Sequence, residues 1–233
     1  MTDPTSCCSD SNDYCDRCDV LLGLAGLRVI GAMRDACGLL TVTVESPPGL
    51  MGCSSCGVVA QGHGRRPVRL IDTPSAGRPV TVIWSKRRWT CPEPACPVGS
   101  FTEQDELVAA PRALLTRRAC WWAIAQMRRE HASVTGLARQ LGTAWHTVWD
   151  SIHPLLAAAA DDEARFAGVS TLGVDEHVWH HVSEQQRGPK FLTGMVDLTR
   201  DTNGHSVARL LDLVPGRSGA AYTGRFLPNE ANR

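Results

Sequence analysis

Two pairs of cysteines have the type and spacing of metal ligands. Cys53 and Cys56 form a C-x2-C pair, and Cys91 and Cys96 follow as a C-x4-C pair after two β-type segments. Four thiolates placed tetrahedrally hold Zn²⁺ at about 2.3 Å and leave no position for water, which makes such a site structural. The spacing therefore predicts one structural zinc site. Two unrelated pairs of buried thiols are the alternative, and His63, in a Gly-flanked loop, is left out as a ligand.

Acidic residues and histidines follow a short apolar run in "TLGVDEHVWHH", residues 171–181. Neighbouring side chains on a strand point to opposite faces, so Asp175 and Glu176 do not share a ligand position there. Asp197 is interpreted as a strand-end acid that precedes an Asn-Gly turn. The role of the histidine cluster stays open, because its members would share a face only on a helix. This cluster consists of His177, His180 and His181.

The segment "SVTGLARQLGTAWHTVWDSI", residues 133–152, has the pattern of a helix-turn-helix. Ala138 lets two helices cross closely, and Gly142 permits the tight turn between them. A generic helical hairpin is the alternative. In a helix-turn-helix, the exposed side of the second helix would face the major groove of DNA. The side chains on that side are Thr143, Trp145, His146, Thr147 and Asp150.

Basic residues are concentrated in the middle of a chain whose formal net charge is zero. Residues 1–50 carry 3 basic and 7 acidic side chains, residues 51–150 carry 13 and 7, and residues 151–233 carry 8 and 10. A basic block between acidic flanks suggests a polyanionic partner, with Arg87 and Arg88 as phosphate contacts. A solvated basic surface is the alternative.

The elements that must position these residues divide the chain into four expected parts. Residues 1–19 read as a flexible acidic tail, in which the role of the thiols stays open. A β-rich zinc-binding domain is expected over residues 20–110, and a helical DNA-binding region over residues 111–168, with its first helix over 111–131 and an Ala-rich helix over 154–168. Three strands follow within residues 169–233. The tail thiols are Cys7, Cys8, Cys15 and Cys18.

Composition excludes several classes of protein. The 233 residues, 43% of them hydrophobic, can bury a real core, and no run of 18 apolar residues indicates a membrane span. The acidic start does not fit a secretory signal, and C-x2-C pairs favour metal binding over disulfides for the ten cysteines. We therefore expect a cytoplasmic, nucleoid-associated protein with no membrane partner.

The order of these motifs resembles the bacterial insertion-sequence transposases of the ISL-three family, over roughly residues 20–225. The resemblance rests on "MGCSSCGVVAQGHGRRPVRLIDTP", "RRWTCPEPACP", the helix-turn-helix and "GVDEH". It implies a zinc-binding head, a helix-turn-helix for the element's ends, and a ribonuclease-H-like DDE domain that uses Mg²⁺ or Mn²⁺. The four cysteines match the zinc ligands, and Asp175 matches the first catalytic Asp, which ends the first strand of that fold.

The sequence departs from the family pattern after Asp212. The family's second Asp follows a fourth strand and its Glu lies farther on, whereas Glu230 is the only acidic residue left here and "RFLPNEANR" does not continue the pattern. Strand transfer of this kind uses two metal ions, which one Asp cannot hold. We therefore expect an amino-terminal part of a transposase, through truncation, frameshift or fragmentation, with an incomplete catalytic domain over residues 169–233.

The overall expectation is an α+β chain of several modules: a zinc ribbon, a helix-turn-helix region and a truncated ribonuclease-H-like domain. Its expected function is DNA binding as a transposase that is doubtful as a catalyst. One alternative is a stand-alone zinc-ribbon and helix-turn-helix regulator, or an inhibitor of the full-length transposase. Another is a metal-dependent hydrolase that uses Asp175, Glu176 and the histidines. The target sequence, expression and any homo-oligomer stay open.

Overall fold

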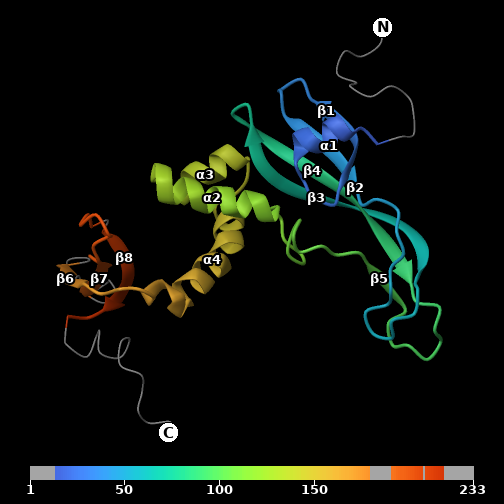
Figure 1. Cartoon of the computed structure of the whole chain (residues 1–233). Coiled ribbons are helices and arrows are strands. Elements are labelled where there is room, and N and C mark those ends of the chain that lie inside the picture. The colour runs from blue at the N-terminus through green and yellow to red at the C-terminus, as the bar shows by residue number, and fades with distance from the viewer. Residues whose placement is uncertain (1–13, 179–189, 207, 218–233) are drawn as a thin grey trace. The chain divides into compact units, whose positions relative to one another are not determined.

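A computed structural model of the chain describes residues 14–178, 190–206 and 208–217 (Figure 1). The chain divides into two compact units, residues 1–156 and residues 157–233, with the division inside a helix. Each unit is described by itself below. None of the helices in the described part of the chain has the length and apolar character needed to span a bilayer.

The first unit is built around a five-stranded sheet. Its strands are β1 (Arg28–Arg34), β2 (Leu40–Glu45), β3 (Gln61–Ser75), β4 (Arg78–Thr90) and β5 (Ser100–Thr102). They are ordered β1-β2-β4-β3, with β5 also paired to β4, and only the β2–β4 pair is parallel. Val80, Val82 and Trp84 alternate with less buried residues along β4 and enter the core, as period-2 patterning requires.

Strands β3 and β4 form a long hairpin. It reverses at Ala76 and Gly77, whose φ angles of 50° and 72° match the two-residue turn that suits the twist of a hairpin. At the opposite, open end, Gln61 pairs with Thr90. The residues just before β3 and just after β4 therefore meet at the open end, and these are the segments that carry the two cysteine pairs.

Helix α1 (Asp16–Leu22) begins inside the segment expected to be a loose tail. The Asp19 carboxylate accepts a hydrogen bond of 2.7 Å from the Val29 N–H and pairs with Arg28 at 2.6 Å. The acidic residues are thus used to attach α1 to β1, which is the physical reason that the tail expectation fails from Asp16 onward.

Three further helices follow the sheet: α2 (Arg117–Glu130), α3 (Val134–Leu141) and α4 (Trp145–Asp161). Helix α2 begins later than the expected start at Pro111, because the Thr116 side chain caps it by accepting from the Ala119 N–H. Helix α4 continues through Pro154 and includes much of the predicted Ala-rich helix. Pro154 removes one N–H, and it lies on an exposed side where water can serve the freed carbonyl.

The second unit contains an antiparallel sheet of order β6-β7-β8. Its strands are β6 (Leu172–Val178), β7 (Phe191–Asp197) and β8 (Arg209–Pro215), and a short 3-10 helix (Glu163–Phe166) precedes them. Met195, Leu211 and Val214 form the buried core. The predicted Asn-Gly turn joins β7 to β8, where the Asp201 carboxylate accepts from the N–H of Asn203 at 2.8 Å.

Candidate metal centre and nucleic-acid interface

The four predicted zinc cysteines converge at the open end of the β3–β4 hairpin. Their sulfur atoms all lie within 4.8 Å of one another. The Sγ atoms of Cys53 and Cys96 are 3.7 Å apart, and those of Cys56 and Cys91 are 3.5 Å apart. Zinc–sulfur bonds of about 2.3 Å in a tetrahedron require S···S distances of about 3.8 Å. The donor set and its dimensions therefore fit a structural Zn²⁺.

Tight backbone turns present the thiols. The Cys53 N–H donates to the Val58 carbonyl at 2.8 Å, and the Gly57 N–H donates back to the Cys53 carbonyl at 2.9 Å. Gly57 has a φ of 74°, which glycine adopts without strain. On the other side of the hairpin, the Cys91 N–H donates to the Gly99 carbonyl at 3.1 Å. Backbone hydrogen bonds thus close each turn around its thiols.

The Cys53 thiol is prepared for ionisation. Backbone N–H groups of Cys56 and Ser55 point at its sulfur and lower the pKa of this thiol to about 7. Because the thiolate is the form that binds metal, these N–H groups favour ligation at neutral pH.

Helices α3 and α4 form the predicted helix-turn-helix. The Ser133 hydroxyl caps α3 by accepting from the Gly136 N–H at 3.1 Å. Gly142, with a φ of 64°, ends α3, and the Thr143 N–H donates to the Ala138 carbonyl at 2.9 Å. This is the left-handed glycine ending typical of a helix that must turn sharply. The apolar residues that join the two helices are all buried; they are Leu137, Leu141, Val148 and Ile152.

The start of α4 presents the predicted groove-facing side chains unequally. Trp145 is 42% exposed, and His146 is also exposed, whereas Thr143 and Thr147 are half-buried. Thr147 and His146 also line a cleft of about 440 Å³ between α4 and the segment 110–117. The start of α4 is thus accessible, and the segment 110–117 forms the other side of the cleft next to it.

An aromatic row along α4 was not recognised from the sequence. The rings of Trp145 and Trp149 stack with centroids 5.8 Å apart, and Trp149 lies 5.0 Å from the His153 ring. The i, i+4, i+8 spacing is the signal that could have shown it. The row fixes the Trp145 ring on the exposed side of α4.

A buried carboxylate attaches the helices to the sheet. Asp72 of β3 is fully buried and accepts from the Thr116 hydroxyl at 2.6 Å and from the Arg118 Nε at 2.8 Å; a second nitrogen of the same guanidinium also contacts it. A buried charge requires such partners. Asp72 therefore fixes the start of α2, and with it the helix-turn-helix, on β3.

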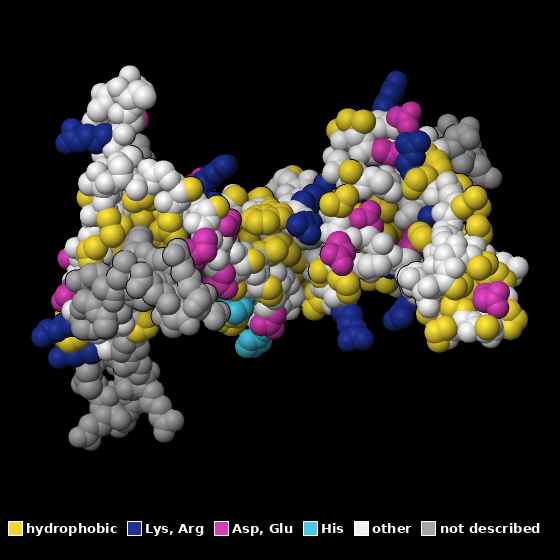
Figure 2. All heavy atoms as spheres, turned by 60° about the horizontal axis from the view of Figure 1, so that its bottom comes forward, with side chains coloured by type: hydrophobic (Ala, Val, Ile, Leu, Met, Phe, Trp, Pro, Cys, Tyr) yellow, Lys and Arg dark blue, Asp and Glu magenta, His cyan; other side chains and the backbone are white. Residues whose placement is uncertain are grey.

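The two arginines predicted as phosphate contacts differ in their surroundings. The Arg87 guanidinium pairs with Glu103 at 3.0 Å, lies over the Trp89 ring and is only 16% exposed. Arg88 is half-buried, and its backbone pairs with that of Thr102 in β5. Figure 2 shows that, on the face it views, Lys and Arg side chains lie singly or in small separate groups and form no continuous patch. Arg87 is therefore engaged within its own unit.

Asp175 lies inside β6 rather than at its end, opposite Gly194 of β7. The strand continues to Val178 because backbone pairing to β7 is kept through that residue. Glu176 is the next residue and points to the other face. Asp197, three residues beyond Gly194 on β7, also points to the other face.

The remaining carboxylates of this sheet have local partners. Asp197 accepts from the Thr199 N–H at 2.9 Å and pairs with Arg209 at 3.0 Å; Thr199, and then Arg209, hold the pKa of this carboxyl below its ordinary value. Asp212 pairs with Arg165 at 3.2 Å. Within residues 14–178, 190–206 and 208–217, no second carboxylate shares the face of Asp175 on this sheet.

The histidine cluster is only partly described. His177 is an exposed residue of β6, and His180 and His181 lie outside the described residues.

Comparison with known families agrees with the two modules of the first unit. Residues 50–96 match the zinc-finger of transposase IS204/IS1001/IS1096/IS1165, and residues 108–155 match the helix-turn-helix domain of transposase family ISL3. The first match contains all four clustered cysteines, and the second contains α2, α3 and the start of α4. No curated protein and no solved structure matches the chain significantly. Residues 50–96 and 108–155 are therefore similar to the zinc ribbon and the helix-turn-helix of ISL3-family transposases, respectively.

Proposed function

We propose that this chain binds the ends of an insertion-sequence element by placing the start of α4 in the major groove. The observation that carries the proposal is the helix-turn-helix itself, with its buried joint and its exposed Trp145 and His146. The helix-turn-helix class reads base edges from this part of its second helix. Thr143 and Thr147 flank these residues and complete the proposed contact.

In this proposal the zinc ribbon has a structural role. We assign Cys53, Cys56, Cys91 and Cys96 as ligands of one structural Zn²⁺, which closes the open end of the β3–β4 hairpin. We assign Arg88 a phosphate contact. Arg87, paired with Glu103, has a positioning role, because it holds the segment after β5 against β4.

Binding of the whole chain to duplex DNA carrying the element's ends tests the proposal. Affinity is expected to fall steeply between 50 and 200 mM salt, since the logarithm of the binding constant falls by about 0.9 per neutralised phosphate for each tenfold rise in salt. His146→Ala is expected to reduce discrimination between end sequence and scrambled DNA by about tenfold. His205→Ala, which changes an exposed histidine outside the helix-turn-helix, serves as the matched control. Equal affinity of the parent chain for both DNAs, or binding independent of salt, would refute it.

The second unit supports a further part of the proposal. Three consecutive antiparallel strands, with Asp175 on the first, are what the beginning of a ribonuclease-H-like domain would show. We propose that residues 169–233 correspond to this part of a DDE domain, which would use Mg²⁺ or Mn²⁺ when complete. The described residues do not assemble such a metal site, because Asp175 has no second carboxylate on its face.

We propose as a second candidate function a DNA-binding regulator or an inhibitor of active transposase, because among the described residues no second carboxylate shares the face of Asp175. The 233-residue chain is expected to give no cleavage of end DNA with Mn²⁺, and Asp175→Ala is expected to leave DNA affinity within about twofold. Gel analysis of labelled end DNA checks the first expectation and titration checks the second. Cleavage that disappears in Asp175→Ala would show that another group completes the site, and the regulator function would then be abandoned.

A further inference from the structure

The tip of the β3–β4 hairpin lies beside the turn of the helix-turn-helix. A Cβ atom placed on Gly142 would be 2.8 Å from Cγ of Pro79, the second residue of β4, so the Gly142 backbone packs directly on the Pro79 ring. Figure 1 shows the same approach, with the hairpin tip next to the end of α3. A contact made by this turn with DNA would therefore bring the hairpin tip to the same duplex.

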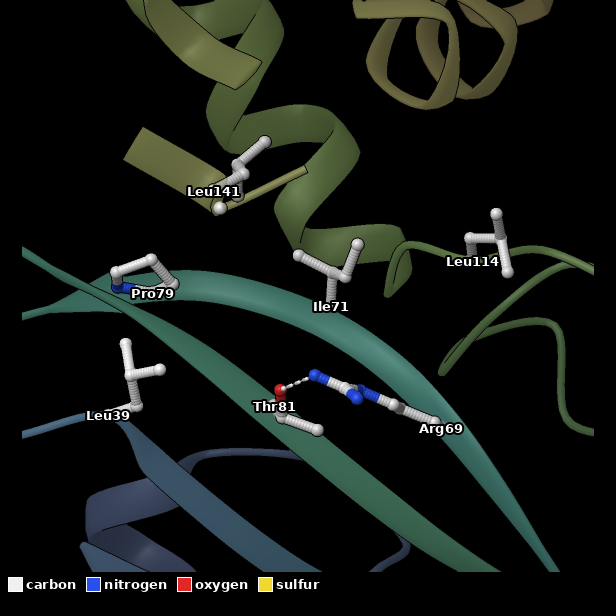
Figure 3. A pocket seen from close by; sticks show the side chains of 8 residues that line it. Leu39, Arg69, Ile71, Pro79, Thr81, Leu114 and Leu141 are labelled. Atoms are coloured by element: carbon white, nitrogen blue, oxygen red, sulfur yellow. Dashed lines mark hydrogen bonds between the residues drawn. The ribbon is translucent and has the colours of Figure 1, made fainter. Parts of the chain in front are cut away.

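A shallow groove connects the helix-turn-helix to the sheet. It encloses about 400 Å³ and runs from Leu141 and Gly142, past Pro79, to Leu39 in the connection between β1 and β2. Figure 3 shows Pro79 between Leu141 and Leu39, with Arg69 reaching along the sheet to Thr81. The turn of the helix-turn-helix, the hairpin tip and the β1–β2 connection thus line one continuous surface.

Three exposed arginines lie on the strands near this surface, and one of them, Arg69, lines the groove. Arg78, the first residue of β4, donates to the Cys37 carbonyl at 2.8 Å, and Arg34, the last residue of β1, donates to the Gly38 carbonyl at 2.8 Å. Arg69 donates one weak hydrogen bond, of 3.3 Å, to Thr81. In the described part of the chain, no ion pair joins any of these arginines to a carboxylate. We call these three residues the tip arginines: Arg78 at the hairpin tip, Arg34 at the end of β1 and Arg69 farther along β3.

One acidic residue lies among them. The Asp35 carboxylate accepts from the Leu39 N–H at 2.8 Å and so closes the turn between β1 and β2. The tip arginines outnumber it, and each keeps guanidinium N–H groups beyond the single hydrogen bond that it donates. A guanidinium with unused N–H groups is suited to the paired oxygens of a phosphate.

We propose that the hairpin tip is a second DNA contact, a wing whose tip arginines bind the phosphate backbone beside the groove entered by α4. The inference rests on the proposed function, because the wing reaches DNA only when the helix-turn-helix is bound. Its charge is complementary to the backbone, and its surface is continuous with the turn that precedes α4. Phosphate contacts of this kind fix the register of a protein on the duplex without reading sequence.

The test compares the parent chain with Arg34→Ala, Arg69→Ala and Arg78→Ala combined, on end DNA. The slope of log affinity against log salt is expected to decrease by about 0.9 for each phosphate that is no longer neutralised. Hydroxyl-radical footprinting is expected to show no protection on one flank, while the protection opposite α4 remains. Preference for the end sequence over scrambled DNA is expected to stay unchanged, which a general failure to fold would not allow.

Combined Lys substitutions at the same positions provide the matched control, since they keep the charge and are expected to restore most of the salt slope. If the parent chain binds end DNA and the Ala variant keeps its slope and full footprint, the wing is overturned and the proposed function stands. If the parent chain binds no DNA, both the wing and the proposed function are refuted. Arg69→Ala alone removes one positive charge without removing a hydrogen bond from the β1–β2 turn, because Arg69 donates to Thr81 of β4.

Discussion

Cys91→Ser is expected to abolish zinc binding and to unfold the cysteine-bearing end of the first unit. The turns that hold the thiols have little core of their own: Leu50 is 87% exposed and Val59 is 54% exposed. In small zinc modules the metal supplies roughly 10–16 kcal/mol of apparent binding free energy, which is also folding free energy. Replacing one of four thiolates with a hydroxyl removes a strong ligand and leaves the others unable to close a tetrahedron.

The unfolding is expected to be local. The sheet core around Val44, Val82 and Trp84 and the helix core around Leu137 and Ile152 are separate apolar clusters that do not include the four zinc-site cysteines. Hydrogen exchange is therefore expected to rise strongly over residues 51–60 and 91–99 and to change little in α2, α3 and α4.

Metal analysis of the purified chain measures the effect directly. One zinc per chain is expected for the parent protein and for Cys37→Ser, which changes an exposed cysteine outside the cluster, and none is expected for Cys91→Ser. Zinc retained by Cys91→Ser, or a parent chain whose exchange does not change in chelator, would contradict the four-cysteine site.

Local sequence patterns were sufficient to predict the zinc site and the helix-turn-helix. The cysteine pairs flank two β-rich segments, and a hairpin is the shortest way to join them, so the pairs had to meet at its open end. The helix-turn-helix has its turn glycine, its cap and its apolar spacing within one short segment. In the helix-turn-helix the residues that determine the geometry are near one another in the sequence. In the zinc site each cysteine pair is local, and a single hairpin brings the two pairs together.

Contacts between distant residues were not predictable in this way. Asp72 and Arg118 pair across 46 positions, and nothing near Asp72 in the sequence marks it as buried. The acidic residues of α1 read as a solvated tail until Asp19 is seen against β1. Likewise, the surroundings of Asp175 depend on the pairing register of β6 with β7, which determines the carboxylates that share its face.

Gly142→Ala is expected to destabilise the first unit by about 2–5 kcal/mol and to abolish binding to element ends. The left-handed conformation at this residue, with a φ of 64°, costs a non-glycine residue roughly 1–2 kcal/mol. The new methyl group would also lie 2.8 and 2.9 Å from two carbons of the Pro79 ring, and such overpacking costs roughly 1–3 kcal/mol. Relief of this clash has to move α3 away from β4, and that movement displaces the start of α4.

Gly136→Ala is the matched control, because there the same Gly-to-Ala change is expected to stabilise the first unit instead of destabilising it. Gly136 lies in the first half of α3 with ordinary helical φ, and a Cβ would meet the Ser133 hydroxyl at 3.4 Å, an ordinary contact. Ala in a helix is favoured over Gly by about 0.5–1 kcal/mol, so this variant should be slightly more stable. Urea unfolding of the two variants measures the difference. Equal stabilities would mean that Gly142 is neither strained nor packed on Pro79, and the close approach of the hairpin tip to the helix-turn-helix would have to be given up.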